Sequence, residues 1–336
     1  MIGLLGYLTL STALVGLYRR LALRNQWLDT PNARSSHRTT TPRGAGLVFV
    51  VLILGAGGWL LHPEYPLLGA LGAGSLVALV GWWDDLRGIS ARVRFIFYSI
   101  AAATAVVLIF DSYGAALVGN HAPAASLVCG AVATLAVVWL INLYNFMDGI
   151  NGIAAIEALF ILLSIALFSI DTPYGHTFLQ LHFASAAAIG GFLLWNFPGG
   201  KVFMGDVGSA FLGFYFGLLS LCSMALEGPS FAVWLILLGF FLVDSSYTLL
   251  VRMVTGQTWH AAHRLHAYQR LTDRLKGSHA HAVAVIMAVN LCWLLPMAWL
   301  VHKQWVGPIF GVSLAYTPLL AFCYRLKAGI PTQGGV

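Results

Sequence analysis

The sequence predicts an all-α membrane protein with about eleven transmembrane helices, folded as a single domain over residues 1–336. Hydrophobic residues make up 59% of the chain and charged residues only 9%, far from the composition of a soluble domain. Apolar runs close to the bilayer-spanning length recur throughout the chain, and each is expected to form a helix. These runs cover residues 2–18, 44–61, 67–83, 95–110, 125–144, 153–170, 181–197, 209–226, 231–251, 281–301 and 306–323.

The positions of the basic residues predict the orientation of the chain. With the N-terminus outside, seventeen of the eighteen Lys and Arg residues fall in inside segments, and only Lys303 falls outside. Because cytoplasmic loops collect basic residues, we expect the N-terminus outside and the C-terminus in the cytoplasm. The net charge of +6 then faces anionic lipid headgroups and phosphorylated substrates, and nucleic acid is not expected as a partner.

Acidic residues gather at the inside ends of the apolar runs. Asp29, Asp84, Asp85, Asp148 and Asp206 all fall on the side that the charge pattern assigns to the cytoplasm. Ionisable groups at membrane depth are costly, so such a collection indicates function. Carboxylates beside glycine-rich turns suit Mg²⁺ and phosphate chemistry, which places the expected active site at the cytosolic face.

Asp84 and Asp85 follow directly on an apolar run. Adjacent carboxylates repel each other unless a cation or a shared proton intervenes. The pair therefore fits a site near a metal ion or a phosphate nucleophile. It equally fits a solvated helix end, with salt bridges to Arg87 and Arg92.

The segment from Asn142 to Gly152 combines amides, a carboxylate and glycines between two apolar runs. Asn142, Asn145 and Asp148 are spaced three apart, so a helix would place all three on one face. Their oxygens suit a hard divalent ion, and the glycines allow the backbone to approach a ligand closely. The alternative is a capped junction between helices, in which Asn and Asp serve turn geometry.

Asp206 lies in a glycine-rich turn before the next apolar run, bracketed by Gly205 and Gly208. Such a turn at a helix N-terminus favours phosphate, while the carboxylate could hold the cation. Phe203, just upstream, could stack on a base. The alternative is an N-capping loop with Phe203 in the core.

Two basic segments could bind anions. The first runs from Arg34 to Arg38 and on to Arg43, and could bind a lipid phosphate or serve only as an inside anchor. The second, residues 263–270, alternates His with Arg within an inside loop that we expect to form a short amphipathic helix or lid. Its arginines match phosphate oxygens, whereas zinc would need further ligands; a solvated basic face is the third possibility.

Glu157 and Asp244 lie inside apolar runs. Either could relay protons. We interpret each as a paired structural group and assign neither a role in the site.

Taken together, these motifs resemble those of the polyprenyl-phosphate N-acetylhexosamine-1-phosphate transferases, in order from about Asp29 to Arg270. The resemblance rests on three sequence patterns: Asp-Asp, Asn-x-x-Asn-x-x-Asp-Gly and Phe-Met-Gly-Asp-x-Gly-Ser. The Asp-Thr-Pro-Asn-x-Arg-Ser-Ser-His start and the His-Ala-Tyr-Gln ending look most like the WbpL-type branch, which begins O-antigen chains on undecaprenyl phosphate in the bacterial inner (plasma) membrane.

The resemblance implies a reaction and a set of residues. Undecaprenyl phosphate would attack the β-phosphorus of a UDP-N-acetylhexosamine, UMP would leave, and the enzyme would work as a possible homodimer. Asp206 and Asn145 would hold Mg²⁺, or Mn²⁺ in its place. Catalytic roles near the lipid phosphate and the metal would fall to Asp84, Asp85 and Asp148. Substrate contacts would come from Asn151, Phe203, Arg264, His266, Arg270 and Arg43.

Two departures from the family pattern bear on the choice of sugar. Asn151 stands where many bacterial members carry a second Asp, so a carboxylate there is not essential in this chain. His263 stands where the enterobacterial common antigen initiators carry Asp.

Two other functions fit the same membrane setting. A CDP-alcohol phosphatidyltransferase needs Asp-Gly-x-x-Ala-Arg with further Asp residues, and Asp148-Gly149 is followed here by Ile-Asn-Gly-Ile-Ala-Ala. A transporter with acidic relays predicts carboxylates near mid-membrane and inverted internal symmetry, whereas the acidic motifs here lie at span ends and no such symmetry is seen.

Overall fold

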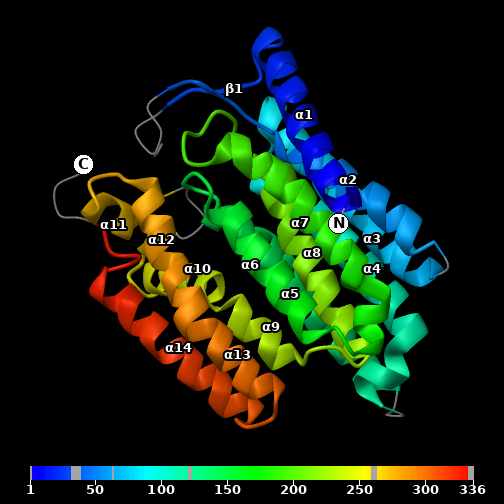
Figure 1. Cartoon of the computed structure of the whole chain (residues 1–336). Helices are drawn as coiled ribbons and strands as arrows, with labels where there is room; N and C mark the ends of the chain where they lie inside the picture. The colour runs from blue at the N-terminus through cyan, green and yellow to red at the C-terminus, as the bar shows by residue number, and fades with distance from the viewer. Residues whose placement is uncertain (1, 32–38, 63, 120–122, 259–262, 332–336) are drawn as a thin grey trace.

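The computed structural model describes residues 2–31, 39–62, 64–119, 123–258 and 263–331. Within these ranges the chain is mostly helical with only two short strands, which confirms the predicted all-α class (Figure 1). The helices are α1 (Ile2–Arg24), α2 (Gly46–Leu60), α3 (Tyr65–Arg87), α4 (Ala91–Val118), α5 (Pro123–Met147), α6 (Ile153–Phe168), α7 (Pro173–Asn196), α8 (Asp206–Ala225), α9 (Phe231–Leu237), α10 (Gly239–Val254), α11 (Ala267–Arg274), α12 (His279–Val289), a π-helical turn η1 (Asn290–Leu294), α13 (Leu295–His302) and α14 (Pro308–Arg325).

Each of the eleven predicted apolar runs coincides with a helix or with a broken helix. By length and composition, six helices among the described residues could cross a membrane, or seven if the bent pair α9–α10 counts as one span. Helices α2 and α6 are apolar but shorter. The protein is therefore a multi-pass membrane protein by the character of its helices, and the count of eleven crossings stays a prediction.

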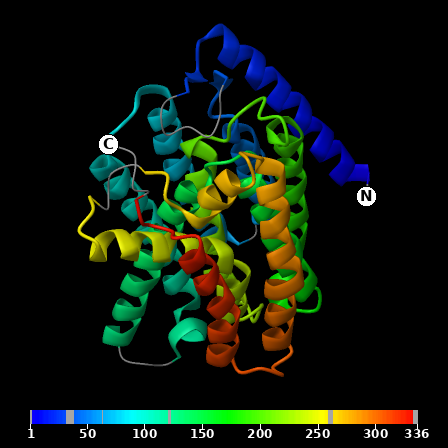
Figure 2. The same cartoon turned by 90° about the vertical axis from the view of Figure 1, so that its left-hand side faces the viewer.

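Two predicted runs are interrupted. The run 231–251 breaks at Leu238, where α9 and α10 meet at 73°. Figure 2 shows the yellow α10 ribbon lying across the bundle, while the orange and red C-terminal helices stand along it. The run 281–301 contains the wider turn η1 just before Pro296, which has no N–H to donate to the preceding turn.

Several helix ends differ from the predicted boundaries. Helix α7 begins at Pro173, eight residues before the predicted start at 181, because Thr172 caps it: the Thr172 hydroxyl accepts from the Gly175 N–H at 3.0 Å. Helix α4 likewise begins at Ala91, after a Ser90 cap. The polar capping residues lie outside the apolar runs. Hydropathy alone therefore predicts a later start for both helices than the structure shows.

Helix α8 forms the centre of the bundle, and all of its residues except Met224 are buried. It packs against α2, α3, α4 and α5. Small residues allow these close approaches. A side chain on Gly81 of α3 would meet the Asp206 carbonyl at 2.6 Å, and one on Gly213 would meet the Leu140 carbonyl at 2.3 Å. The sequence thus brings the N-terminus of α8 against the C-terminal end of α3.

A two-stranded antiparallel ribbon lies beside this helix end. Strands β1 (Leu28–Asp29) and β2 (Thr41–Pro42) pair Leu28 with Pro42 and Asp29 with Thr41. The chain after β2 then bonds to the α7–α8 connection, through the Phe203 N–H to Pro42 O at 2.8 Å and the Gly46 N–H to Met204 O at 2.9 Å. Figure 1 shows β1 and α11 toward the same end of the bundle, at the upper left.

The approach of α3 to α8 gives a first prediction. Gly81→Ala should lower the free energy of unfolding by about 1–3 kcal/mol, because its methyl group would overlap backbone atoms at the start of α8. The thermal unfolding midpoint in detergent measures this. Gly72→Ala, on the same helix with open space around it, is the matched control and should unfold at or slightly above the wild-type temperature. Equal midpoints for Gly81→Ala and wild type would contradict the close packing.

Candidate active site

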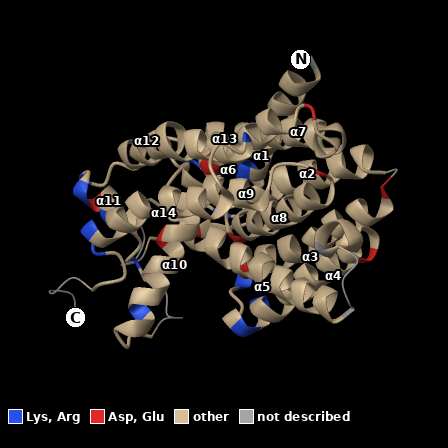
Figure 3. Cartoon of the chain, turned by 90° about the horizontal axis from the view of Figure 1, so that it is seen from below, with Lys and Arg blue, Asp and Glu red and all other residues tan. Residues whose placement is uncertain are grey.

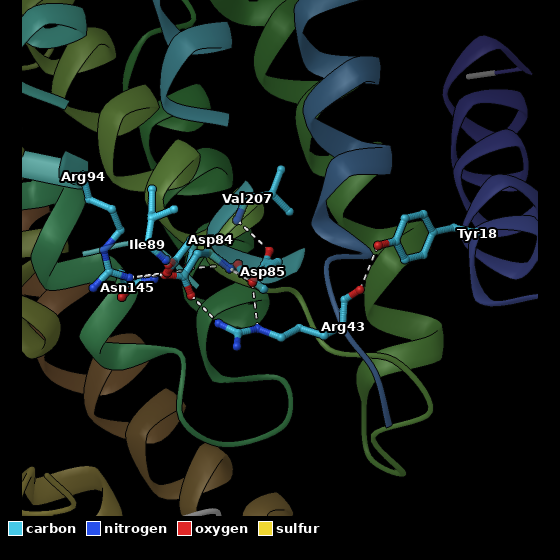
Figure 4. Close-up of polar contacts among 11 residues, drawn as sticks. Tyr18, Arg43, Asp84, Asp85, Ile89, Arg94, Asn145 and Val207 are labelled. Atoms are coloured by element: carbon cyan, nitrogen blue, oxygen red, sulfur yellow. Dashed lines mark hydrogen bonds and ion pairs between the residues drawn. The ribbon is translucent and has the colours of Figure 1, made fainter. Parts of the chain in front are cut away.

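Asp206, the first residue of α8, is held between two arginines, Arg43 and Arg94. Figure 4 labels both arginines, which point toward Asp84 and Asp85. Asp206 Oδ1 accepts from Arg43 Nη2 at 2.6 Å, and its Oδ2 accepts from Arg94 Nη1 at 2.7 Å. The Asp206 residue is only 8% exposed. A carboxylate at a helix N-terminus is favoured by the helix dipole, and here two guanidinium groups add to that field.

Asp85 fixes the start of α8 from the end of α3. Its Oδ1 accepts from the Asp206 N–H at 2.9 Å and its Oδ2 from the Val207 N–H at 3.1 Å. Arg43 Nε also bonds to Asp85 Oδ1 at 2.7 Å. Asp85 therefore satisfies two N–H groups that a helix leaves unpaired at its first turn, although it comes from a different helix.

Asp84 makes a second anchor at the α3–α4 turn. It accepts from the Ile89 N–H at 2.6 Å and forms an ion pair with Arg94. Arg43 and Arg94 thus take the place of the partners Arg87 and Arg92 that the helix-end interpretation predicted. We name the three carboxylates Asp84, Asp85 and Asp206, together with Arg43 and Arg94, the charge cluster.

Arg43 is placed by its backbone. Its N–H donates to Trp27 O at 3.1 Å, and its carbonyl accepts from the Tyr18 hydroxyl at 2.7 Å. Burial lowers the pKa of the Arg43 guanidinium, but the carboxylates of Asp206, Asp85 and Asp29 outweigh it and raise the pKa above its ordinary value. Arg43 is therefore a fixed positive charge beside Asp206.

A cavity of about 240 Å³ opens beside the charge cluster. One wall carries Arg43, Asp206 and two residues from the end of α5, Asn145 and Asp148. The remaining wall is mostly neutral and polar, with side chains that can exchange hydrogen bonds with a ligand. It includes Asn151, Asn196, Phe203, Ser209, Gln269 and His279.

Asn145 and Asp148 reach the cavity because α5 ends between them, at Met147. Asn145 Nδ2 donates to Ser209 Oγ at 3.0 Å, which ties α5 to α8. Burial first, and then the negative charges of Asp206 and Asp85, raise the pKa of Asp148 despite the opposing Arg43. Asn142 turns away, since its amide donates to Val138 O within its own helix at 2.7 Å.

Two asparagines shape the neutral wall. Asn196 Oδ1 accepts from the Gly152 N–H at 2.7 Å, and its Nδ2 donates to Val202 O at 2.9 Å, so it joins the 148–152 and 197–205 loops. The Asn151 N–H donates to His279 Nδ1 at 3.2 Å. The predicted contacts Asn151 and Phe203 therefore face the same cavity as Asp206.

The predicted contacts of the 263–270 segment lie elsewhere. Arg264 pairs with Asp273 at 2.7 Å, and Arg270 donates to Ile330 O at 2.5 Å. Neither residue lines the cavity, nor does His266. The other basic motif, Arg34–Arg38, lies outside the described residues.

His266 is buried beside Asp244. The Asp244 carboxylate caps α11 by accepting from the Ala267 N–H at 2.8 Å and the Tyr268 N–H at 2.9 Å. The interpretation of Asp244 as a paired structural group fits these contacts. The cap aims α11 so that Gln269, rather than an arginine, reaches the cavity.

Five residues of the site were not singled out in the sequence as ligand contacts: Arg94, Asn196, Ser209, Gln269 and His279. Arg94 could have been found from the sequence, because it lies in the first turn of α4, the helix that follows the Asp-Asp pair. Gln269 ends the His-Ala-Tyr-Gln pattern but was assigned no contact, and His279 belongs to no pattern. Both reach the cavity through the packing of α11 and α12.

The cavity wall fits a hard divalent cation by its donor chemistry. Within the described residues, no group of three or more His, Cys, Asp or Glu side chains forms a metal site on its own. Mg²⁺, however, commonly takes one or two carboxylates and completes its shell with water and substrate phosphate. Asp206, Asp148 and the Asn145 amide offer that set, and carboxylate oxygens have lone pairs beyond those used by the arginines.

The fold and the site define a multi-pass helical membrane protein with a carboxylate-rich polar cavity, in which basic and acidic segments interrupt a largely uncharged bundle (Figure 3). Residues 67–224 match the profile of glycosyl transferase family 4. This segment contains Asp84, Asp85, Asp148 and Asp206, and α8 as far as Met224.

Curated relatives extend the match over most of the chain. It is 27% identical over 281 residues to a probable undecaprenyl-phosphate N-acetylglucosaminyl 1-phosphate transferase of Bacillus subtilis, covering 82% of this chain and 77% of that protein. It is 29% identical over 310 residues to a decaprenyl-phosphate N-acetylglucosaminephosphotransferase of Mycolicibacterium smegmatis, covering 81% and 74%. A phospho-N-acetylmuramoyl-pentapeptide-transferase of Chlamydia muridarum is 29% identical over 201 residues, covering 54% and 58%.

These matches support the predicted superfamily: the chain is similar to polyprenyl-phosphate N-acetylhexosamine-1-phosphate transferases. They do not single out the WbpL-type branch.

The contacts of Asp85 give a prediction about stability. Asp85→Asn should lower the free energy of unfolding by about 1–3 kcal/mol, because an amide cannot accept all three hydrogen bonds and leaves a buried donor unpaired. Chemical or thermal unfolding in detergent measures this. Asp111→Asn, the same change at an exposed position of α4, should leave stability unchanged. Wild-type stability in Asp85→Asn would show that Asp85 does not anchor α8.

Proposed function

We propose that the protein transfers N-acetylhexosamine-1-phosphate from a UDP-N-acetylhexosamine to undecaprenyl phosphate. An oxygen of the lipid phosphate forms a bond to the β-phosphorus of the nucleotide sugar. The bond between that phosphorus and the oxygen bridging to the α-phosphorus breaks, and UMP leaves with the electron pair. The products are UMP and undecaprenyl diphosphate-N-acetylhexosamine.

One observation carries the proposal: Asp206 opens the central helix inside a polar cavity that Asn145 and Asp148 also line. Phosphoryl transfer depends on charge neutralisation and in-line positioning more than on covalent catalysis by the protein. The charged side chains of this cavity lie beside a space that a ligand can occupy. The names of two relatives, from B. subtilis and M. smegmatis, describe transfer to undecaprenyl and decaprenyl phosphate, which supports a polyprenyl phosphate as acceptor.

Mg²⁺ is the proposed cofactor, with Mn²⁺ as a substitute. Asp206 and Asn145 would hold it, with Asp148 beside them. Such an ion neutralises diphosphate charge and favours departure of the leaving phosphate.

The chain's own residues would bind and orient the two reactants. Arg43 and Arg94 supply positive charge for phosphate oxygens, and Asp84 and Asp85 position the lipid phosphate or accept its proton. Asn151 and Phe203 would contact the uracil from the neutral wall. Arg264, His266 and Arg270 lie outside the cavity, so a role in gripping the sugar diphosphate requires that the α11 segment move toward it.

The proposed setting is the bacterial inner (plasma) membrane, with eleven crossings, the N-terminus outside and the site at the cytosolic face. The basic residues support this orientation, because those of the charge cluster and those at the ends of α1, α3, α10 and α14 fall in the same set of connections. UDP-sugars are cytosolic, which demands the same face. We further propose a homodimer of the WbpL-type branch that starts O-antigen or another cell-surface polysaccharide.

Asp206→Asn should abolish transfer while the protein stays folded. The neutral amide removes the charge that holds the cation, and a loss of at least about 100-fold is expected for an electrostatic group of this kind. UMP release from UDP-N-acetylglucosamine with undecaprenyl phosphate and Mg²⁺ measures it, alongside the unfolding midpoint. Asp273→Asn, an exposed carboxylate on α11, is the matched control and should retain activity. Wild-type turnover by Asp206→Asn would remove Asp206 from the mechanism.

Removal of divalent cations should stop the same reaction. EDTA is expected to reduce UMP release to background, and Mg²⁺ or Mn²⁺ in excess of the chelator should restore it, because both ions accept oxygen ligands. The unfolding midpoint in EDTA serves as the control for integrity. Full turnover in chelator would rule out the proposed cation.

A further inference from the structure

Arg94 is bound to the charge cluster through a single nitrogen. Both of its ion pairs, to Asp84 Oδ2 and to Asp206 Oδ2, use Nη1. Its Nε and Nη2 make no hydrogen bond to any residue that the structure describes, and its side chain is 30% exposed. A guanidinium has five N–H donors, so Arg94 keeps most of them available for another acceptor.

Arg43 differs in this respect. It uses two nitrogens, Nε on Asp85 and Nη2 on Asp206, in the forked manner that suits carboxylates. Its backbone is also tied to Trp27 and Tyr18. Of the two arginines, Arg94 is thus the one that can leave Asp206 with the smaller loss of contacts.

The charge count explains why Arg94 would leave. Three carboxylates and two guanidiniums leave the charge cluster with one net negative charge. A divalent cation at Asp206 would reverse that sign and would repel a guanidinium bonded to the same carboxylate. An anionic diphosphate arriving with the cation would give the displaced guanidinium new oxygen partners.

We propose that Arg94 is a placeholder for the divalent cation at Asp206, and that it moves to phosphate oxygens of the nucleotide diphosphate when the cation binds. The inference rests on the proposed function and adds to it an antagonism between Arg94 and the cation. It also makes binding of cation and nucleotide diphosphate cooperative, because each removes an unfavourable charge that the other creates.

The test measures Mn²⁺ binding to the purified full chain in detergent, from the free Mn²⁺ signal in electron paramagnetic resonance, with and without UDP. Wild type should bind Mn²⁺ weakly alone and at least about tenfold more tightly with UDP. Arg94→Gln should bind Mn²⁺ alone about tenfold more tightly than wild type and lose most of the gain from UDP. Arg92→Gln, an exposed arginine of the same helical turn, is the matched control and should behave as wild type.

A second variant separates charge from shape. Arg94→Lys keeps the positive charge, so its Mn²⁺ affinity should stay closer to wild type than that of Arg94→Gln. Unchanged or weaker Mn²⁺ binding in Arg94→Gln, or equal shifts in both variants, would overturn the inference and leave the proposed transferase standing. Absence of Mn²⁺ binding in every variant, with UDP present, would overturn the inference and the proposed cation together.

Discussion

The buried carboxylate of Asp206 is the constraint on which the site depends. It opens the most buried helix of the bundle, where a negative charge is costly unless compensated. The compensation comes from three sources: the N-terminus of α8 and the guanidinium groups of Arg43 and Arg94. Each source fixes a neighbouring element, so the charge organises the packing around it.

The surrounding architecture follows from that requirement. Gly81 allows α3 to come close enough for Asp85 to bond the first N–H groups of α8. The β1–β2 ribbon and the hydrogen bonds to the backbone of residues 203–204 position Arg43 beside Asp206. In the α3–α4 turn, Asp84 accepts a hydrogen bond from the Ile89 N–H, and this turn positions Arg94 beside Asp206.

Much of this could be predicted from the sequence, because membrane helices leave a strong apolar signal and functional carboxylates are conspicuous among so few charges. Local patterns predict the helices, and the family resemblance implies the common site of Asn145, Asp148, Asn151, Phe203 and Asp206, which line one cavity. Asp206 combined a carboxylate, flanking glycines and a helix start, and the structure uses all three.

The rest depends on contacts between distant segments. Arg94 is ten residues from Asp84, yet the sequence offered Arg87 and Arg92 as equally good partners, and only the direction of α4 decides among them. The bend at Leu238 could not be predicted from a proline, because neither α9 nor α10 contains one. Asp244 caps α11 and thereby directs Gln269 to the cavity, while Arg264 and Arg270 stay outside it. The spacing of residues in the sequence does not reveal this orientation of α11.

The most direct test of the central claim is the position of the cation itself. Crystals of the full chain grown with Mn²⁺ and UDP would locate it by anomalous scattering. We expect a peak at metal–oxygen bonding distance, about 2.1 Å, from a carboxylate oxygen of Asp206. A peak bound elsewhere in the cavity, with Asp206 still held by both arginines, would contradict this expectation.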